Sequence, residues 1–295
     1  MTTTEAYIDF IKKLKTIYDE READNIADWV FENVTDLKKW ERRIDGNREL
    51  AEIHSNKIRE YLRELLQNKP VQYVLNECWF YKRKFFVNEN VLIPRPETEE
   101  LVEWIIKDIQ EINAGNSKPT YLSDRQANII DIGTGSGCVS ISLKKELSKQ
   151  NVAAIDISEK ALSVAKKNAE DLNAEIEFLK IDFLNKKEWN RLGQYDIIVS
   201  NPPYIPIKEK EILKKNVIDF EPGIALFVGN NDPYIFYEKI AEFSETHLKK
   251  NGRIYVEVHE EYANNVEVVF EKAGLVTILK KDIYGKERMV KAIKS

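Results

Sequence analysis

The sequence contains few of the residues that build disulfide frameworks and metal sites. Its 295 residues include two cysteines, Cys78 and Cys138, and three histidines, which stand far apart at positions 54, 247 and 259. Two cysteines are too few for a fold held by disulfides, so we expect a protein of the reducing cytoplasm. The scattered histidines do not form a metal-ligand pattern, and we expect no metal.

Export signals, membrane spans and an excess of positive charge are also missing. Residues 1–17 carry Glu5, Asp9, Lys12 and Lys13 within their apolar pattern, which excludes a signal peptide or a membrane span there. The chain holds 45 Lys and Arg against 50 Asp and Glu, for a formal net charge of -5. A broad nucleic-acid surface needs many basic residues, because nonspecific binding is driven by counterion release from phosphates. The composition excludes such a surface but allows a small basic patch.

The length allows one large domain or two medium ones, and 43% hydrophobic residues suit a folded core. From Thr4 to Pro70, apolar residues recur at helical spacing and glycine is nearly absent, which predicts a helical bundle over residues 1–70. Between Val71 and Ile93, β-branched and aromatic residues surround a polar turn at 88–90. We expect a β-hairpin linker over 71–93 and a second domain over 94–295.

Two prolines flank Arg95 and favour an extended backbone, after which residues 97–99 open a helix that should reach about Ile112. A loop containing Gly115 to Pro119 follows. From Asn128 onward helices alternate with strands, which we expect at 128–132, 152–155, 175–179, 195–200, 253–258, 276–280 and 288–293. This alternation predicts an α/β fold with a mostly parallel sheet covered by helices on both faces. Ligands of such sheets bind beyond the carboxyl ends of the strands.

The first strand of this domain leads into a glycine-rich turn, which consists of Asp131, Ile132, Gly133, Thr134, Gly135, Ser136 and Gly137. Glycine at every second position lets the backbone turn sharply and approach a ligand closely. The spacing lacks the two-residue gap before the last glycine of the dinucleotide fingerprint. Asp131 also places a negative charge where a pyrophosphate would be repelled and a cationic ligand attracted.

Acidic residues end the next two strands. Asp156 lies where a carboxylate can accept hydrogen bonds from both hydroxyls of a ribose. Asp182 could accept the amino group of an adenine, with Phe183 packing on the ring, although a turn or cap residue is an alternative role for Asp182. A cationic ligand that carries a ribose fits these residues, and S-adenosylmethionine is the candidate.

The most specific motif follows the strand at 195–200 and consists of Asn201, Pro202, Pro203 and Tyr204. The prolines stiffen the loop and remove two backbone donors. The side-chain carbonyl of Asn201 and the backbone carbonyl of Pro202 can then accept both hydrogens of a planar NH2 group, which directs its lone pair at a methyl group. Tyr204 can stack on the planar group. No general base is required, because the nitrogen becomes acidic after methyl transfer.

Together these residues resemble the peptide chain release factor glutamine methyltransferases, a family of class I S-adenosylmethionine-dependent enzymes. The run Pro-Arg-Pro-Glu-Thr-Glu at 94–99 carries most of the resemblance, because Asn-Pro-Pro-Tyr also occurs in adenine methyltransferases that act on nucleic acid. Further similar stretches lie at 70–73, 221–222, 225–227 and 281–288, so the match covers nearly the full length.

The resemblance implies a class I methyltransferase fold, with a seven-stranded, mostly parallel Rossmann-like sheet and an N-terminal helical domain that docks the substrate protein. It implies methyl transfer to the side-chain amide nitrogen of the glutamine in the Gly-Gly-Gln motif of release factors, which supports translation termination. The implied cofactor contacts are Asp131, Gly133 to Gly137, Asp156, Asp182, Phe183 and Asn201. The glutamine would contact residues 201–204, with Asn201, Pro202 and Tyr204 as catalytic residues, and Arg95 and Glu97 as further substrate-binding candidates.

Two positions depart from the family's pattern. Asn76 stands where glycine usually follows the linker, and His259 stands where the family tends to carry glycine. Neither belongs to the proposed chemistry. We expect a cytoplasmic monomer whose partners are release factors, without direct sequence-specific contacts to nucleic acid.

Three alternatives remain open. An adenine N(6)-methyltransferase would need a basic and aromatic target-recognition region, which the acidic N-terminal segment does not offer. A related group of enzymes modifies a glutamine of a ribosomal protein, and the motifs do not separate that substrate from release factors. A cofactor-binding scaffold without activity would have no use for the acceptor pair at Asn201.

Overall fold

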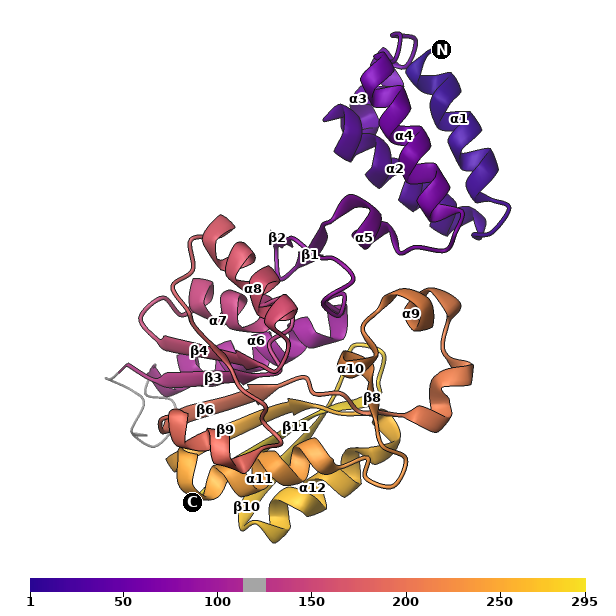
Figure 1. The fold of residues 1–295 in the computed structure, drawn as a ribbon. Coiled ribbons are helices and arrows are strands. Elements are labelled where there is room, and N and C mark those ends of the chain that lie inside the picture. Colours follow the sequence, from indigo (N-terminus) through magenta and orange to yellow (C-terminus); the bar gives the residue numbers. More distant parts are fainter. Residues whose placement is uncertain (114–125) are drawn as a thin grey trace. The chain divides into compact units, whose positions relative to one another are not determined.

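The protein is described by a computed structural model that covers residues 1–113 and 126–295. The loop expected at Gly115 to Pro119 therefore lies outside the described residues. The chain divides into two compact units, which Figure 1 draws in the colours of the sequence. Unit 1 consists of Met1–Glu77 and Lys214–Phe220, and unit 2 of Cys78–Leu213 and Glu221–Ser295.

Helices build unit 1. They are α1 (Thr3–Leu14), α2 (Glu20–Thr35), α3 (Lys39–Asp45), α4 (Glu52–Leu65), α5 (Val71–Leu75) and α9 (Lys215–Phe220). The side chains of Thr2 and Asp19 cap α1 and α2 by accepting hydrogen bonds from backbone N–H groups of the first turns. Residues such as Phe10, Phe31 and Leu65 are fully buried in one apolar core. The helical bundle expected at the N-terminus is thus confirmed.

The start of the expected linker is helical rather than extended. Val71–Leu75 forms the short helix α5, because Pro70 sits at its N-cap and its carbonyl accepts hydrogen bonds from the N–H groups of Tyr73 and Val74. Asn76 ends this helix with a left-handed φ of 53°. Glycine adopts this conformation without strain, and asparagine is among the few other residues that tolerate it, which accounts for the departure at this position.

The hairpin itself is shorter than expected and turns earlier. It pairs β1 (Cys78–Phe80) with β2 (Arg83–Phe85), and the turn lies at Tyr81 and Lys82, both with positive φ, rather than at 88–90. Two consecutive positive φ values are typical of a tight two-residue hairpin. Neither residue is glycine, so the sequence carries no signal for this turn. The strand interpretation of 71–75 was wrong. Residues 88–90 do form a turn, in which the carbonyl of Asn88 accepts the N–H of Val91 at 3.1 Å, but this is not the turn of the hairpin.

A seven-stranded sheet forms the centre of unit 2, with strand order β10-β11-β9-β6-β3-β4-β5. Its strands are β3 (Asn128–Ile132), β4 (Asn151–Asp156), β5 (Glu177–Lys180), β6 (Tyr195–Ser200), β9 (Leu248–Glu257), β10 (Leu275–Lys281) and β11 (Glu287–Lys294). Within this sheet β11 runs antiparallel to both of its neighbours, and the pairs from β9 to β5 are parallel. The mostly parallel sheet and all seven expected strands are confirmed.

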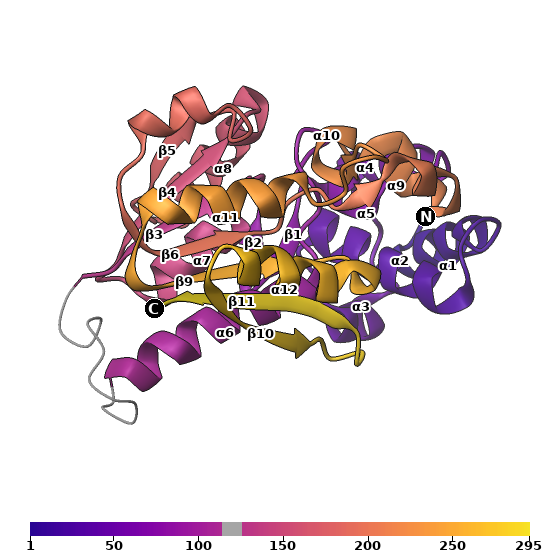
Figure 2. The ribbon, with the colours of Figure 1, turned by 90° about the horizontal axis from the view of Figure 1, so that it is seen from below.

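Helices cover both faces of this sheet, as Figures 1 and 2 show. One face packs on α6 (Pro96–Asn113), α7 (Cys138–Glu146) and α8 (Glu159–Asp171), and the other on α11 (Ile235–His247) and α12 (Ala263–Lys272). Successive strand residues alternate between the two cores: Ile129 belongs to the first and Ile130 to the second. The helix expected from residues 97–99 to about Ile112 is confirmed as α6.

The segment between β6 and α11 carries small elements that the sequence pattern did not predict. They are β7 (Ile205–Pro206), which pairs in parallel with β8 (Phe227–Val228), the 3-10 helix η2 (Ile207–Ile212) and the short helix α10 (Gly223–Leu226). Two further 3-10 helices are η1 (Lys186–Arg191) and η3 (Glu260–Tyr262). A two-residue strand is too short to show any periodicity, so these elements could not be recognised in advance.

Candidate active site

The site lies at the carboxyl ends of three neighbouring strands of unit 2. Ile132 at the end of β3 is paired with Ile155 of β4 on one side and with Ser200 of β6 on the other. The Ser200 hydroxyl donates a hydrogen bond to the carbonyl of Ile132, at 2.7 Å. The glycine-rich turn and the motif that starts at Asn201 therefore begin side by side.

A cavity of about 200 Å³ opens between these strand ends. Most of the candidate residues line it, and these are Arg95, Asp131, Gly133, Thr134, Gly135, Ser136, Asp156, Asp182, Phe183, Asn201, Pro202 and Pro203. Three candidates do not belong to the lining: Gly137, Glu97 and Tyr204. The structure thus brings both halves of the predicted site to one cavity.

Two glycines of the turn leave space for a ligand. Gly133 and Gly135 have φ values of 75° and 55°, and a Cβ atom at either position would meet no protein atom within 4 Å. The positive φ favours glycine, and the open space beside it allows close approach of another molecule. Gly137 differs, because a Cβ there would lie 2.9 Å from the Ile141 side chain and 3.2 Å from that of Ala165. Its role in the structure is close packing between α7 and α8.

Asp131 is a buried carboxylate on the cavity wall. Its Oδ2 accepts hydrogen bonds from the Thr134 hydroxyl at 2.6 Å and from the Ser140 N–H at 3.2 Å. Burial raises the pKa of Asp131 to about 6, although both hydrogen bonds favour the ionised form. Near neutral pH this position therefore carries a poorly solvated negative charge, which favours a cationic ligand.

Asp156 connects the end of β4 to the glycine turn. Its two carboxylate oxygens accept backbone hydrogen bonds from Gly135 at 2.9 Å and Ser158 at 2.8 Å. Burial raises the pKa of this carboxyl, and the backbone donors oppose the shift. Each carboxylate oxygen can accept more than one hydrogen bond, so the side chain retains acceptor capacity toward hydroxyl groups in the cavity.

The two roles considered for Asp182 are compatible. Its Oδ1 accepts the N–H of Leu184 at 3.1 Å, which makes it a turn residue, and the residue also lines the cavity. Phe183 stacks on Trp189, with ring centroids 5.5 Å apart, and also lines the cavity. This stacking fixes the Phe183 ring at the cavity wall, and its packing on an adenine stays a prediction.

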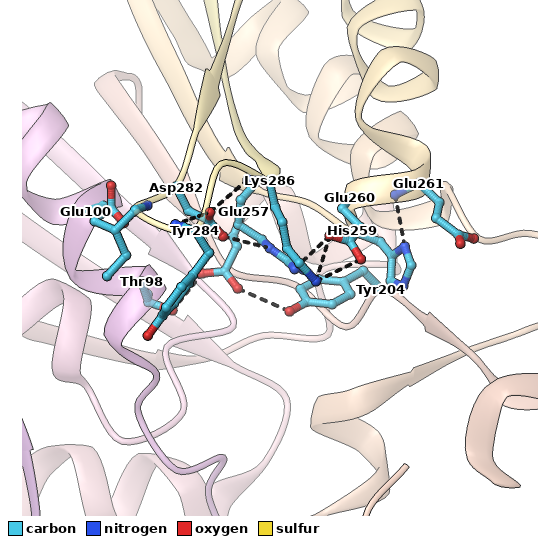
Figure 3. Close-up of polar contacts among 12 residues, drawn as sticks. Thr98, Glu100, Tyr204, Glu257, His259, Glu260, Glu261, Asp282, Tyr284 and Lys286 are labelled. Atoms are coloured by element: carbon cyan, nitrogen blue, oxygen red, sulfur yellow. Dashed lines mark hydrogen bonds and ion pairs between the residues drawn. The ribbon is translucent and has the colours of Figure 1, made fainter. Parts of the chain in front are cut away.

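Asn201 belongs to a chain of hydrogen bonds that reaches into the core. Its Nδ2 donates to the Thr98 hydroxyl at 3.1 Å, and that hydroxyl donates to Glu257 Oε2 at 2.6 Å. The Tyr204 hydroxyl donates to Glu257 Oε1 at 3.1 Å (Figure 3). Burial raises the pKa of both Glu257 and Tyr204. Tyr204 is thus bound to the carboxylate instead of lining the cavity, which places its ring differently from the stacking role predicted for it.

A second buried carboxylate holds the segment before α6. Glu221 accepts hydrogen bonds from the Ile93 N–H at 3.2 Å and from the Arg95 guanidinium at 2.6 Å. Arg95 is therefore fixed at the cavity wall by an ion pair. Glu97 lies one residue inside the first turn of α6 and outside the cavity lining.

Sequence reasoning missed Thr98 and Glu257 as site residues, and it did not recognise Glu221 as the partner of Arg95. Thr98 and Glu221 lie in stretches that carry the family resemblance, and Glu257 ends a strand, but no local pattern indicates which distant side chain each one contacts. Thr98 and Glu257 are separated by 159 positions. Only the fold brings such pairs together.

The turn between β10 and β11 supports the same region (Figure 3). Asp282 Oδ1 accepts the N–H groups of Tyr284 and Lys286, both at 2.9 Å. The N–H of Ile283 donates to Glu100 Oε1 in α6, at 2.8 Å. This turn thereby ties the first part of α6, which carries Thr98, to the end of the sheet.

His259 lies beside this network and outside the cavity lining. Its Nδ1 accepts the N–H of Glu261 at 3.2 Å, which caps η3, and its ring contacts that of Tyr204 edge-on at 6.0 Å. His259 is therefore a packing and capping residue.

The described residues offer neither a metal-ligand cluster nor a membrane-spanning helix. No group of three or more His, Cys, Asp and Glu side chains within 1–113 and 126–295 is arranged to hold a metal ion. In the same part of the chain, every helix is too short or too polar to cross a membrane.

Family models match both parts of the chain. The PrmC N-terminal domain matches residues 5–75, and the Methyltransferase small domain matches residues 119–220. Among curated relatives, a release factor glutamine methyltransferase of Flavobacterium psychrophilum is 42% identical over 283 residues, covering 96% of this chain and 95% of the relative. An enzyme of the same name from Bacteroides thetaiotaomicron is 38% identical and covers 82% of each chain. One from Lactococcus lactis is 36% identical over 95% of this chain and 98% of its own length.

A solved structure agrees on the fold. The hMettl16 catalytic domain, in complex with MAT2A 3'UTR hairpin 6, matches with a TM-score of 0.53 at 14% sequence identity, covering 83% of this chain and 82% of that one. At this identity the likeness concerns the fold alone. The class I methyltransferase fold implied by the sequence is confirmed.

Proposed function

Because the chain belongs to the release factor glutamine methyltransferase family, we propose that it methylates the glutamine of the Gly-Gly-Gln motif in peptide chain release factors and so supports translation termination. In this proposal the methyl donor is S-adenosylmethionine and the acceptor is the side-chain amide nitrogen. Family membership makes the chain a methyltransferase. The identity of the methyl donor, the acceptor motif and the role in translation termination are the parts of the proposal that the experiments below test.

The observation that carries the proposal is the orientation of Asn201 in the cavity. Its Nδ2 is engaged by Thr98, and among the described residues none donates to its Oδ1. Asn201 Oδ1 and the carbonyl of Pro202, both on cavity-lining residues, would accept the two hydrogens of the glutamine amide. This would hold the amide plane and direct the nitrogen lone pair, so that orientation lowers the barrier without a general base.

The cavity suits S-adenosylmethionine, which would supply the methyl group when bound. Gly133 and Gly135 provide a turn with open space where side chains would obstruct a ligand. Asp131 offers negative charge for a cationic ligand, and Asp156 offers acceptors for ribose hydroxyls. Asp182 and Phe183 would bind the amino group and the ring of the adenine. These acidic residues and the open turn suit a positively charged nucleoside, whereas they would repel a pyrophosphate.

Unit 1 would dock the release factor, since its residues match the PrmC N-terminal domain and it has a core of its own. We propose that the enzyme acts in the cytoplasm as a monomer. Recognition would run through the protein substrate, because the net charge of -5 gives no broad nucleic-acid surface. Arg95, fixed by Glu221 at the cavity wall, and the neighbouring Glu97 are the candidates for contacts to the residues beside the target glutamine.

The test is to incubate the protein with methyl-labelled S-adenosylmethionine and a purified release factor, and to locate the label by peptide mass spectrometry. We expect one methyl group on the glutamine of the Gly-Gly-Gln peptide. A release factor with that glutamine replaced by alanine serves as the matched control and should take up no label.

Parallel reactions with total ribosomal protein and with adenine-containing DNA and RNA distinguish the alternatives. Label on a ribosomal-protein glutamine in place of the release factor would change the substrate but keep the chemistry. Label on adenine would overturn the glutamine assignment. Cofactor binding without transfer to any of these would favour a scaffold.

A further inference from the structure

One buried carboxylate of unit 2 contacts two residues of the site without lining the cavity itself. Glu257, at the end of β9, is 2% exposed and accepts hydrogen bonds from the hydroxyls of Thr98 and Tyr204. The proposed methyl transfer uses no carboxylate at this position. A buried charged group costs free energy unless it is hydrogen-bonded, so its presence beside the site calls for a role.

With Glu257 ionised, the donors and acceptors in this cluster can be arranged in only one direction. An ionised carboxylate accepts hydrogen bonds and donates none. Thr98 has a single hydroxyl proton, and that proton is directed to Glu257 Oε2 at 2.6 Å. The Thr98 oxygen can therefore act only as an acceptor toward Asn201, 3.1 Å away.

The same argument extends to the side-chain amide of Asn201. An asparagine can present either its NH2 group or its carbonyl oxygen to a neighbour by rotating half a turn about χ2. Toward Thr98 only the NH2 group finds an acceptor, so the amide oxygen must point the other way. A substrate NH2 group needs that oxygen and would be repelled by a second NH2 group.

We propose that Glu257, acting through Thr98, is a positioning residue that fixes the Asn201 amide with Oδ1 toward the substrate. This inference rests on the proposed function, because the reason to fix the oxygen is recognition of a substrate NH2 group. Glu257 does not touch the substrate. It determines which group donates and which accepts in each hydrogen bond from Glu257 through Thr98 to Asn201, the side chain that contacts the substrate.

Tyr204 receives a related role from the same carboxylate. Its hydroxyl donates to Glu257 Oε1, and its pKa is raised by burial, so it stays protonated and keeps donating. The two ends of the Asn-Pro-Pro-Tyr loop are thereby bound to one group, Asn201 through Thr98 and Tyr204 directly. This accounts for the position of Tyr204 outside the cavity lining.

The test compares four variants with the wild type in the release-factor assay. Thr98→Val keeps the shape of the side chain but removes the acceptor, and it should lower kcat about tenfold, the effect of losing one hydrogen bond of about 1.4 kcal/mol. Thr98→Ser restores the hydroxyl and should recover most of the activity. Glu257→Gln can donate to Thr98 and so removes the fixed direction, with a similar loss. The double variant of Thr98→Val and Glu257→Gln should lose no more than the worse single one, because both act through one amide.

Two controls separate positioning from damage to the fold. Ser244→Ala removes another buried hydroxyl of unit 2, which donates to the carbonyl of Ala241, and should leave kcat unchanged. For every variant, the affinity for S-adenosylmethionine should stay within about twofold of the wild type, and the thermal midpoint is recorded. The effect should fall on kcat rather than on cofactor binding.

A readout independent of turnover completes the experiment. The side-chain NH2 signals of Asn201, assigned by their absence in Asn201→Asp, should shift and exchange faster with solvent in Thr98→Val and stay close to wild type in Thr98→Ser. Unchanged signals in Thr98→Val, or equal kcat for Thr98→Val and wild type, would overturn the positioning role. If the wild type methylates no glutamine, the proposed function fails, and the amide signals still decide whether Thr98 orients Asn201.

Discussion

At the scale of single residues, Asn201 is the group on which the proposed chemistry depends most. Asn201→Ala removes one of the two acceptors for the substrate NH2 group while leaving the carboxylates and the glycine turn in place. We expect turnover to fall by about 100-fold or more, the range found when one oriented group that stabilises a transition state is removed. Affinity for S-adenosylmethionine should change little.

Isothermal calorimetry and a turnover assay on the same preparation measure both quantities. Thr98→Ser, which keeps the hydroxyl that holds Asn201, is the matched conservative change in the same network. Near-normal turnover in Asn201→Ala would remove the acceptor pair from the mechanism.

Asp131 gives a pH-dependent prediction. Its folded pKa of about 6 lies above the ordinary value of 3.8, so the folded state holds this proton more tightly than the unfolded state does. Stability from this group is therefore present at low pH and is lost as pH rises from about 4 to about 6, by roughly 3 kcal/mol at most.

Asp131→Asn removes this titration. As pH rises through this window, the free energy of unfolding should therefore fall in the wild type but not in the variant. Denaturant unfolding at several pH values between 4 and 7 measures the difference. A constant difference across the window would contradict the raised pKa. A bound cation favours the ionised carboxylate, so saturating S-adenosylmethionine should move the wild-type change to lower pH.

Much of the cavity could be predicted because its residues follow strand ends directly. The glycine turn, Asp156, Asp182 and Asn201 each lie at or just past the end of a strand that the apolar pattern reveals, and parallel strands bring their carboxyl ends together. Thr98 and Glu221 could not be assigned partners in this way. Their contacts join positions more than a hundred residues apart, and such pairing depends on tertiary packing that one sequence does not reveal.

At the scale of elements, regular helices and strands were predictable and short ones were not. The central strands β3, β4 and β6 are buried apolar runs, whereas α5 is a single turn capped by Pro70 and the left-handed Asn76. Its β-branched and aromatic composition indicated a strand. Burial of Tyr73 and Val74 and the capping at both ends outweighed that preference.

The glycine-rich turn offers a prediction at this scale, because it combines two different demands on glycine. Gly135→Ala meets no protein atom within 4 Å and should cost mainly the strain of φ 55°, roughly 1–2 kcal/mol. Gly137→Ala adds a Cβ at 2.9 Å from Ile141 to similar strain, so it should lose more stability.

Gly135→Ala should lose more affinity for the cofactor than Gly137→Ala, because a Cβ at Gly135 would enter the open space of the site, whereas a Cβ at Gly137 would press on Ile141. Denaturant unfolding and calorimetry on the two variants provide the comparison. Equal losses of affinity would mean that the turn acts as a whole and that the two roles are not separable.

At the scale of the whole molecule, the two units have separate apolar cores, and every residue that lines the cavity belongs to unit 2. A ligand stabilises the part of a protein whose folded form it requires, by about 2.7 kcal/mol at a hundred times its Kd. Saturating S-adenosylmethionine should therefore slow amide hydrogen exchange in β3, β4 and β6 far more than in α1, α2 and α4.

Hydrogen exchange with mass spectrometry, with and without cofactor, tests this expectation. The chemically similar control is adenosine, which lacks the cationic part and should protect unit 2 less. Equal protection of α1, α2 and α4 would show that both units unfold together.

Unit 1 is built from two stretches of the chain that are far apart in the sequence, and this affects the order in which it folds during synthesis. Its first part ends at Glu77, but its last segment, Lys214–Phe220, is made only after most of unit 2 has been translated. At roughly 5–20 residues per second, the nascent bundle waits on the order of 10 to 30 s for α9. We therefore expect the N-terminal helices to form their apolar core first, because none of its residues comes from α9, and α9 to join them only when the second half of the chain is available.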